Sequence, residues 1–377
     1  MNITIIGSAH PLRGGGISTF NERLAEVLQE QGHHVVIYSF SLQYPSFLFP
    51  GKSQFTDEPA PAGLTIRSVI NSVNPLNWIQ VGNRIKKEKP DLIIVRFWLP
   101  FMGPCFGTIL RLVRKNKHTK IVAITDNVIP HEHRPGDMAF TKYFLKSADA
   151  FVAMSKEVLK DLATFTNKPS VFSPHPVYDN YGSSLDKNEA RKHLSLNTDE
   201  KYILFFGFIR KYKGLDLLLE AMKDERIKAS GIRLIVAGEF YDDKETYLQQ
   251  IADYGIAERV HLFTEFIPNN DIRYYFSAAD LVVQPYRSAT QSGITQVAYH
   301  FEKPMVVTNV GGLAEVVPDG KTGFVTGPDA TEIATAILKF YSPDSLPGLQ
   351  ENIRQEKQKY SWDTFLNSLL SVAGFRN

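Results

Sequence analysis

The sequence has little cysteine, no long apolar run and almost no net charge. Its single cysteine, Cys105, excludes an internal disulfide framework and favours a reducing compartment. The net charge of +2 gives no bulk affinity for nucleic acid. No apolar run approaches the roughly 20 residues of a membrane-spanning helix, and the first residues read as a strand rather than as a signal peptide. We therefore expect a cytoplasmic protein, with peripheral attachment at the inner face of a membrane as the open alternative.

The chain is longer than one hydrophobic core usually supports, so its 377 residues predict two domains. The hydrophobic content of 43% and the charged content of 22% are ordinary for a globular enzyme. Predicted strands and helices alternate along residues 2–165, and a second such series begins at residue 202. Between them, the Pro-rich segment at residues 173–178 predicts a hinge. The sequence is therefore of the α/β class, with two similar halves.

Residues 284–323 form the most informative stretch of the second half. They predict the end of a strand, a polar turn, a helix at residues 293–301 and a strand at 304–309, which together make a βαβ crossover. The turn places Ser292 and Gly293 at a helix N-terminus, where free N–H groups and the helix dipole bind a phosphate. An ordinary capped helix is the alternative interpretation.

A glycine-rich loop precedes the first predicted helix, at residues 21–31. The loop contains Arg13 and Gly14-Gly15-Gly16, which raises the possibility of a dinucleotide-binding fingerprint. The glycines lack the G-x-G-x-x-G spacing, however, and the next strand does not end in the acid that would bind a ribose. A flexible turn remains the plain alternative.

Titratable residues follow the predicted strand at residues 120–125. Asp126 comes directly after it, and His131 lies five residues further on. Side chains just beyond a parallel strand face the ligand crevice of a doubly wound sheet. A metal site is disfavoured because His131, Glu132 and His133 are adjacent and lack the spacing of metal ligands. Asp126 as the cap of a turn and His131 as a packed side chain remain the alternatives.

The second half also carries a series of short motifs that together resemble a known family. They are a glycine that opens a helix, a Lys-Pro strand start, a GG-x-x-E motif and a D-G-x-x-G motif, in the following residues: Gly293, Lys303-Pro304, Gly311-Gly312, Glu315, Asp319-Gly320 and Gly323. In this order they resemble the donor-site segment of the retaining, nucleotide-sugar-dependent glycosyltransferases of family GT4, which have the GT-B fold.

The resemblance covers almost the whole chain and implies two Rossmann-like, doubly wound domains that face each other across a cleft. Residues 1–176 would form the acceptor-side domain and residues 177–357 the nucleotide-sugar-binding domain. Residues 358–377 would form a terminal helix that crosses back to the first domain. The implied partners are a nucleotide-sugar donor and a glycan or lipid-linked acceptor, as in cell-envelope or surface polysaccharide synthesis. No cofactor and no metal are implied.

The resemblance also implies roles for single residues. In the family a G-R-x-x-x-x-K-G turn clamps the donor diphosphate. Lys213 matches its lysine, whereas Phe208 stands at its arginine position, so we expect Arg210 to substitute. Further donor-side residues implied by position are Gly15, Gly16, Gly238, Phe266, Ile267, Ser292 and Gly293.

Two acids that the family uses to recognise donor hydroxyls are absent. Thr290 occupies the first position. The second position falls on Ala298 when counted from Gly293 and on Val297 when counted back from Pro304. We therefore expect Gln291 or Gln296 to contact the donor instead. On the acceptor side Asp126 replaces a frequent histidine, and we expect Asp126 or His131 to line the cleft near the reacting sugar.

Three functions stay open at this point. The first is a retaining glycosyltransferase, in which Lys213, Arg210 and the amides near Ser292 stabilise the leaving diphosphate. The second is a nucleotide-sugar epimerase or hydrolase of the same fold, which the scarcity of carboxylates disfavours. The third is a catalytically silent binding protein, which the retained Lys213 disfavours.

Overall fold

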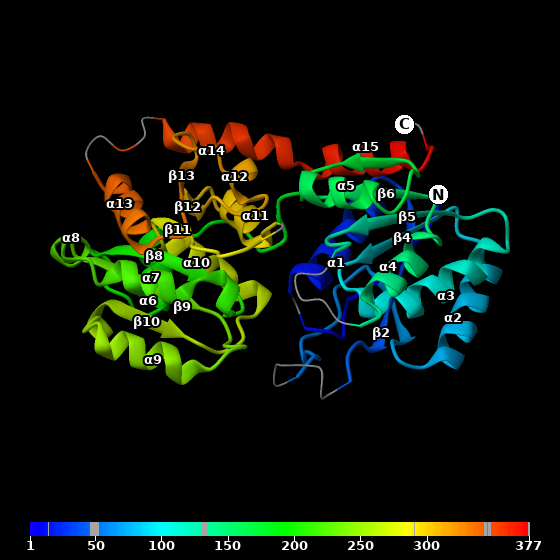
Figure 1. Cartoon of the computed structure of the whole chain (residues 1–377), viewed down its shortest axis with the longest axis horizontal. Coiled ribbons are helices and arrows are strands. Elements are labelled where there is room, and N and C mark those ends of the chain that lie inside the picture. The colour runs from blue at the N-terminus through cyan, green and yellow to red at the C-terminus, as the bar shows by residue number, and fades with distance from the viewer. Residues whose placement is uncertain are drawn as a thin grey trace. The chain divides into compact units, whose positions relative to one another are not determined.

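The computed structural model describes residues 1–13, 15–45, 53–129, 135–289, 291–342, 345 and 348–375. The chain forms two compact units, the first made of Met1–His175 with Trp362–Asn377 and the second of Pro176–Ser361 (Figure 1). The chain therefore leaves the first unit once and returns to it with its last helix. The domain ends predicted at residues 176 and 357 lie one and four residues from these boundaries.

The first unit contains a seven-stranded sheet in the order β3-β2-β1-β4-β5-β6-β7, and all its described pairings are parallel. Its strands are β1 (Asn2–Ile6), β2 (His34–Leu42), β3 (Thr65–Asn71), β4 (Leu92–Phe97), β5 (Lys120–Thr125), β6 (Ala150–Ala153) and β7 (Ser170–Phe172). Central strands such as β4 are buried along their whole length. A parallel sheet covered on both faces requires such continuous apolar runs.

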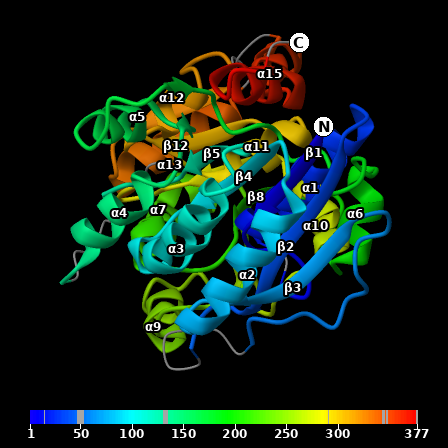
Figure 2. The same cartoon turned by 90° about the vertical axis from the view of Figure 1, so that its right-hand side faces the viewer.

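Helices cover this sheet in two groups. The helices of the first unit are α1 (Gly16–Glu30), α2 (Pro75–Glu88), the 3-10 turn η2 (Pro100–Met102), α3 (Gly103–Arg114), α4 (Asp137–Leu145), α5 (Lys156–Ala163) and α15 (Trp362–Val372). Helices α2, α3 and α4 share one hydrophobic cluster with the sheet and lie side by side in Figure 2. Helices α1 and α15 meet through Phe20, Trp362 and Phe365.

Helix α1 begins five residues before the helix predicted at residues 21–31. A glycine-rich start has a poor intrinsic preference for helix. Packing overrides that preference here, because Phe20 is fully buried against Trp362 and Phe365, and Ser18 and Thr19 are buried beside it. Gly16 was expected in the loop before the helix, and that expectation was wrong for this reason.

The second unit contains a six-stranded parallel sheet in the order β10-β9-β8-β11-β12-β13. Its strands are β8 (Lys201–Phe206), β9 (Ile232–Ala237), β10 (Val260–Phe263), β11 (Leu281–Gln284), β12 (Met305–Thr308) and β13 (Gly323–Thr326). Its α-helices are α6 (Lys187–His193), α7 (Leu215–Met222), α8 (Glu225–Ala229), α9 (Lys244–Asp253), α10 (Ile272–Ala278), α11 (Gly293–His300), α12 (Leu313–Val316), α13 (Ala330–Phe340) and α14 (Leu349–Lys357). Its 3-10 turns are η3 (Lys211–Lys213), η4 (Ala257–Arg259), η5 (Asn269–Asp271) and η6 (Gln358–Tyr360).

The two sheets share one strand order, which is that of a doubly wound fold. In each sheet the first three strands in the sequence are added toward one edge, and the later strands are added toward the other edge. This reversal of strand order lies between β1 and β4 in the first unit and between β8 and β11 in the second. Ligands of such sheets bind outside the carboxyl ends of the strands at this reversal. The predicted α/β class with two Rossmann-like units is confirmed. None of the described helices has the length and apolar character that crossing a bilayer requires.

Candidate functional site

The donor-side residues predicted in the second half lie in loops at one edge of the second sheet. Residues 207–214 follow β8, residues 238–240 follow β9, residues 264–268 follow β10, and residues 285–292 follow β11. Because all these strands are parallel and adjacent, their carboxyl ends share that edge. The loops after β8 and β11 flank the point where the strand order reverses, where this fold binds ligands.

Lys213 is a buried cation at this reversal. Its side chain belongs to η3, is 9% exposed, and places Nζ 5.9 Å from the centroid of the Tyr286 ring. Burial, and then the positive charge of Arg210, lower the pKa of the Lys213 ammonium from 10.5 to about 8. Within the described part of the chain no carboxylate or carbonyl accepts a hydrogen bond from Nζ. A buried ammonium without an anionic partner is costly unless a ligand supplies one.

The loop that carries Lys213 is fixed against the loop after β11. Gly214 has φ +69°, and a Cβ there would lie 2.0 Å from the Pro285 carbonyl oxygen. The Arg287 amide donates to the Tyr212 carbonyl at 2.7 Å, and Arg287 Nη2 lies 2.5 Å from Asp216 Oδ2. Only glycine permits this approach, so the two flanking loops hold Lys213 as one structure.

The N-terminus of α11 lies next to the Lys213 ammonium. A Cβ on Gly207 would lie 3.0 Å from Lys213 Nζ and 3.3 Å from Ile294 Cδ1 in the first turn of α11. The N-cap residue Ser292 makes no side-chain cap bond, and its Oγ lies instead 3.3 Å from the Tyr286 hydroxyl. The first turn of α11 also contains no acid. The helix therefore offers its N-terminal N–H groups and its dipole beside a cation, which is an arrangement suited to phosphate.

Gly207 and Gly238 bring the loops after β8 and β9 into backbone contact. Gly238 has φ +145°, and a Cβ there would lie 2.4 Å from the Gly207 carbonyl oxygen. The Gly238 amide donates to the Phe263 carbonyl at 2.9 Å. After β10, Phe266 and Ile267 are half-buried. These residues lie at the carboxyl edge of the sheet on the β9 and β10 side of Lys213, and their contact with a nucleotide stays a prediction.

Arg210 is exposed and held by an aromatic pair. Its guanidinium lies 5.1 Å from the centroid of the Tyr241 ring, and Phe208 stacks on the same ring at 4.5 Å. Its charge is close enough to lower the pKa of the Lys213 ammonium. The substitution of Arg210 for the missing arginine stays a prediction, because the exposed Arg210 side chain lies over Tyr241 and shows no phosphate contact by itself.

The two predicted glutamines differ in burial. Gln296, on α11, is 1% exposed, and its Oε1 has no hydrogen-bond partner among the described residues. Gln291 is half-buried in the loop before the helix. Val297 and Ala298, at the position of the second family acid, are both buried in the core. A carboxylate there would lose its hydration, which accounts for the apolar residues.

Several parts of the recognised motifs stabilise the fold. The Lys303 ammonium donates to the carbonyls of Ala279 at 2.9 Å and Ser277 at 3.4 Å, at the end of α10. Asp319 Oδ1 accepts from the Val325 amide at 3.0 Å. A Cβ on Gly323 would lie 1.9 Å from the Met305 carbonyl oxygen. The Lys-Pro and D-G-x-x-G motifs therefore shape the second sheet.

In the first unit Asp126 follows β5 and is paired with a residue that the sequence did not indicate. Arg96 at the end of β4 donates from Nε to Asp126 Oδ2 at 2.7 Å and from Nη2 to Oδ1 at 2.9 Å. Arg96 also donates to the Gly16 carbonyl at 3.3 Å and lies over the Phe20 ring at 4.2 Å. Its place at the carboxyl end of a predicted strand was the signal that could have identified it.

This ion pair positions the start of α1. Gly15 is the extended N-cap of that helix, and Gly16 is its first residue. Asp126 thus orients Arg96, which in turn holds the Gly15-Gly16 backbone at the reversal point of the first sheet. His131 lies outside the described residues, so its predicted role stays a prediction. The described parts of the chain contain no group of three or more His, Cys, Asp or Glu residues that could hold a metal ion.

Two family models match adjoining ranges of the chain. The model described as Glycosyltransferase Family 4 matches residues 14–186, and the one described as Glycosyl transferases group 1 matches residues 186–360. Together the matches run from the glycine-rich loop of the first unit to the end of the second.

Curated relatives include D-inositol 3-phosphate glycosyltransferases. The chain is 27% identical over 306 residues to D-inositol 3-phosphate glycosyltransferase 1 of Catenulispora acidiphila, across 75% of this chain and 71% of the relative. It is 32% identical over 197 residues to the D-inositol 3-phosphate glycosyltransferase of Mycobacterium marinum, across 49% of this chain and 41% of the relative. In this second comparison the chain spans less than half of the relative's length.

Solved structures match along almost the entire chain. A glycosyltransferase from Rickettsia africae has a TM-score of 0.74 at 19% identity, across 99% of this chain and 98% of its own. The protein HepE of Anabaena in complex with UDP-glucose has a TM-score of 0.71 at 16% identity, across 99% of both chains. At these identities the likeness is one of fold.

Proposed function

Because the chain belongs to glycosyltransferase family 4 and has the GT-B fold, we propose that it transfers a hexosyl group from a nucleotide-diphosphate sugar to a glycan or lipid-linked acceptor with retention of configuration. The observation that carries this proposal is the buried Lys213 ammonium beside the N-terminus of α11. An anion bound there gains a charged hydrogen bond and the helix dipole together.

The proposed reaction breaks the bond between the anomeric carbon and the β-phosphate oxygen. The acceptor oxygen bonds to the same face of the sugar, and its proton passes to the departing phosphate. Negative charge grows on the β-phosphate as the bond breaks. Lys213, Arg210 and the N–H groups after Ser292 would stabilise that charge more strongly in the transition state than in the ground state, which is what accelerates a reaction.

The proposed donor is supported by the complex of HepE, a structure of the same fold, with UDP-glucose. We propose that Gly238, Phe266 and Ile267 contact the nucleotide and that Gln291 or Gln296 contacts the sugar hydroxyls. We further propose that the transfer serves surface polysaccharide synthesis and takes place at the inner face of a membrane. We also propose that the transfer needs no metal ion. The cationic side chains supply the charge that a metal provides to the diphosphate in other transferases.

A panel of nucleoside diphosphates and nucleotide sugars tests this function. Ligands that bind the folded state raise the Tm, so at least one nucleotide sugar should raise it in the wild type and fail to do so in Lys213→Ala. Release of the nucleoside diphosphate should be slow without an acceptor and fast with one. A panel in which every compound leaves the Tm unchanged would remove the proposed donor.

A further inference from the structure

Ser292 opens helix α11 without capping it. Serine is a preferred N-cap residue because its hydroxyl oxygen accepts from the amide of the second or third helical residue, which is Ile294 or Thr295 here. The extended backbone of Ser292, with φ −135° and ψ 119°, is that of an N-cap, yet its side chain makes no cap bond. Its Oγ lies instead 3.3 Å from the hydroxyl of the buried Tyr286. The serine side chain is therefore engaged with Tyr286 rather than with the helix that it begins.

Ser155, at the start of α5, shows the usual behaviour of the same residue type in this chain. Its backbone is similar, with φ −137° and ψ 154°, and its Oγ accepts from the amide of Val158, the third residue of α5, at 3.1 Å. Both helices have eight residues. Because the residue type and the helix length are the same, we attribute the missing cap of α11 to the Tyr286 hydroxyl.

Tyr286 is held so that its hydroxyl stays on Ser292. Its carbonyl oxygen accepts from Thr308 Oγ1 at 2.6 Å, and its ring packs edge-to-face on the Tyr212 ring at 6.1 Å. Within the described residues Ser292 is the only hydrogen-bond partner of the Tyr286 hydroxyl. A buried phenol needs a partner, and an unsatisfied buried hydroxyl is at least as unfavourable as one cap bond is favourable. The contact with Tyr286 therefore prevails over the cap.

The other polar side chain in the first turn of α11 does not cap the helix either. The Thr295 hydroxyl donates to Gln284 Oε1 on β11 at 3.1 Å. A Cβ on Gly293 would lie 3.2 Å from Tyr178 Cε2, so the start of the helix is closely packed. The first-turn amides thus have no side-chain acceptor among the described residues, and the Lys213 ammonium lies beside them.

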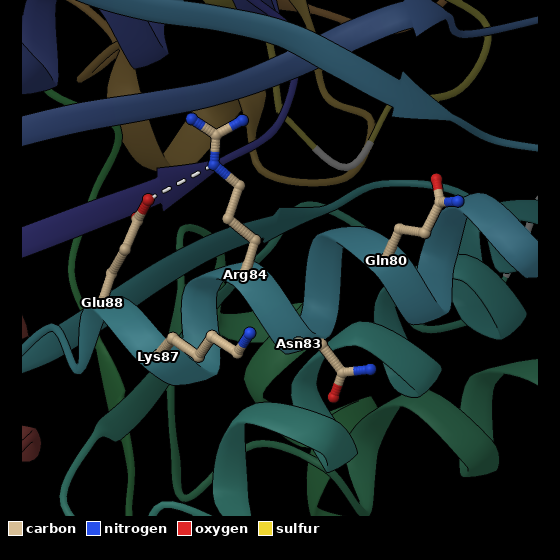
Figure 3. Close-up of a pocket in the computed structure, with 5 residues that line it drawn as sticks. All are labelled: Gln80, Asn83, Arg84, Lys87 and Glu88. Carbon is tan, nitrogen blue, oxygen red and sulfur yellow. Dashed lines mark hydrogen bonds and ion pairs between the residues drawn. The ribbon is translucent and has the colours of Figure 1, made fainter.

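The hollow on the outer side of α2 is a poorer place for an anion. It is lined by side chains of a single helix, namely Gln80, Asn83, Arg84, Lys87 and Glu88. Figure 3 shows Arg84 and Lys87 extending apart, and the Arg84 guanidinium is paired with Glu88 at 3.4 Å. A phosphate there would compete with a carboxylate for one cation. The start of α11 instead combines donors from η3 and α11, and its first turn contains no acid.

We propose that Tyr286 is a positioning residue of the phosphate site, because it holds the Ser292 hydroxyl away from the first-turn amides of α11 and so keeps them free for the donor. This inference rests on the proposed function and adds to it a residue that touches neither the phosphate nor the sugar. With Phe at position 286, the released Ser292 hydroxyl would cap the helix, and a phosphate would have to displace it. Tyr286 thus lowers the stability of the helix start and raises its affinity for phosphate.

Amide hydrogen exchange of the ligand-free full chain, followed by NMR, tests the cap directly. In Tyr286→Phe the amide of Ile294 or Thr295 should exchange about threefold or more slowly than in the wild type, because it gains a cap bond. Val158 is capped by Ser155 in both proteins and should exchange equally. Adding Ser292→Ala to Tyr286→Phe should restore fast exchange in α11. Unchanged exchange at both amides of Tyr286→Phe would overturn the inference.

Two single variants give the same test with Tyr286 left in place. Ser155→Ala removes a cap bond and should speed the exchange of Val158 by about threefold or more. Ser292→Ala removes no cap bond and should leave the exchange of Ile294 and Thr295 unchanged. Faster exchange at either amide in Ser292→Ala would show that Ser292 caps α11 in solution, and the inference would fail.

Calorimetry with inorganic pyrophosphate and with UDP tests the consequence for binding, because both probes carry a diphosphate. Tyr286→Phe should weaken the binding of both by roughly threefold to tenfold, since the new cap bond competes with the phosphate. Tyr286→Phe/Ser292→Ala should bind both roughly threefold or more tightly than Tyr286→Phe does. The matched control Tyr286→Phe/Ser155→Ala should bind as Tyr286→Phe does. Disturbed packing around residue 286 would not be reversed by removing one hydroxyl at residue 292.

The failure of this inference and the failure of the proposed function give different results. If the double variant with Ser292→Ala binds no more tightly than Tyr286→Phe, the inference is overturned and the proposed function stands. If the wild type binds neither UDP nor pyrophosphate, the donor function is overturned, and the phosphate role of Tyr286 fails with it.

Discussion

Lys213 is the residue at which fold stability and proposed function oppose each other. Its buried ammonium has its pKa lowered from 10.5 to about 8 by burial first and by Arg210 second. At about 1.36 kcal/mol for each pKa unit, holding that charge costs the ligand-free fold up to roughly 3 kcal/mol. We expect Lys213→Met to raise the Tm without ligand. The same variant should lower donor turnover by on the order of 100-fold or more.

The pH dependence of this variant gives an independent check. Below about pH 8 the folded wild type carries the full cost of the charge, and between pH 8 and 10.5 the unfolded chain binds more protons than the folded one. Wild-type stability should therefore recover across that window, and the advantage of Lys213→Met should shrink. Donor affinity should fall as pH rises through about 8 in the wild type only. Equal Tm values for the two proteins at pH 7 would contradict this account.

At Gln296, as at Lys213, the side chain proposed to bind the donor is expected to lower the stability of the fold. Its buried Oε1 has no partner in the described structure, and an unsatisfied buried acceptor costs about 1–3 kcal/mol. Gln296→Leu should keep or raise the Tm and should increase the KM for the donor by roughly twofold to tenfold, as one lost hydrogen bond does.

Gln284 supplies the matched control for Gln296. It is also 1% exposed, but its Oε1 accepts from Thr295 Oγ1 at 3.1 Å. Gln284→Leu should lower the Tm, because the Thr295 hydroxyl loses its buried partner. If Gln296→Leu loses as much stability as Gln284→Leu and leaves the KM unchanged, Gln296 is a packing residue.

At the scale of elements, the turn that ends η3 decides where Lys213 lies. Gly214 and Gly231 have nearly the same backbone, with φ +69° and +70°. A Cβ on Gly214 would strike the Pro285 carbonyl oxygen, whereas one on Gly231 would meet nothing within 4 Å. Gly231→Ala should cost only the left-handed penalty of about 1–2 kcal/mol. Gly214→Ala should cost more and also displace Lys213.

Donor turnover distinguishes the two glycine variants. A misplacement of about 1 Å can cost on the order of 100-fold in rate, so Gly214→Ala should lose donor turnover well beyond its loss of stability. Gly231→Ala should keep wild-type turnover at temperatures where it is folded. Equal effects of both variants on turnover would show that contact with Pro285 does not position Lys213.

Local sequence signals predicted buried strands better than edges and long-range pairs. Strand β5 has the predicted bounds of residues 120–125, because its buried apolar run ends at a clear turn signal. Strand β3 was missed because it is a half-exposed edge strand in which Arg67 and Ser68 interrupt the apolar residues. The Lys213 turn was found from its motif, but its contact with Pro285 joins residues far apart in the chain. No local pattern encodes such a contact.

At the scale of the whole molecule, the two units share a strand order but differ in the charge at the point where that order reverses. The reversal point of the second sheet holds an unneutralised cation, Lys213. That of the first holds Arg96, whose charge is matched by Asp126 through two hydrogen bonds of 2.7 and 2.9 Å. A phosphate is therefore attracted to the second unit, whereas the first suits an uncharged group such as an acceptor hydroxyl.

Substitutions in the Arg96–Asp126 pair should consequently affect transfer and not donor binding. Asp126→Asn leaves a buried guanidinium unmatched, and breaking a buried pair costs about 3–5 kcal/mol. The Tm should fall, but the Tm increase caused by a bound nucleoside diphosphate should persist, since we propose that this ligand binds to the second unit. The double variant Arg96→Met/Asp126→Leu should recover stability, because well-packed apolar residues often replace a buried ion pair without loss. If the pair positions Gly15 and Gly16 for the acceptor, the double variant should remain deficient in transfer at wild-type stability. Recovery of transfer together with stability would show that the ion pair serves the fold alone.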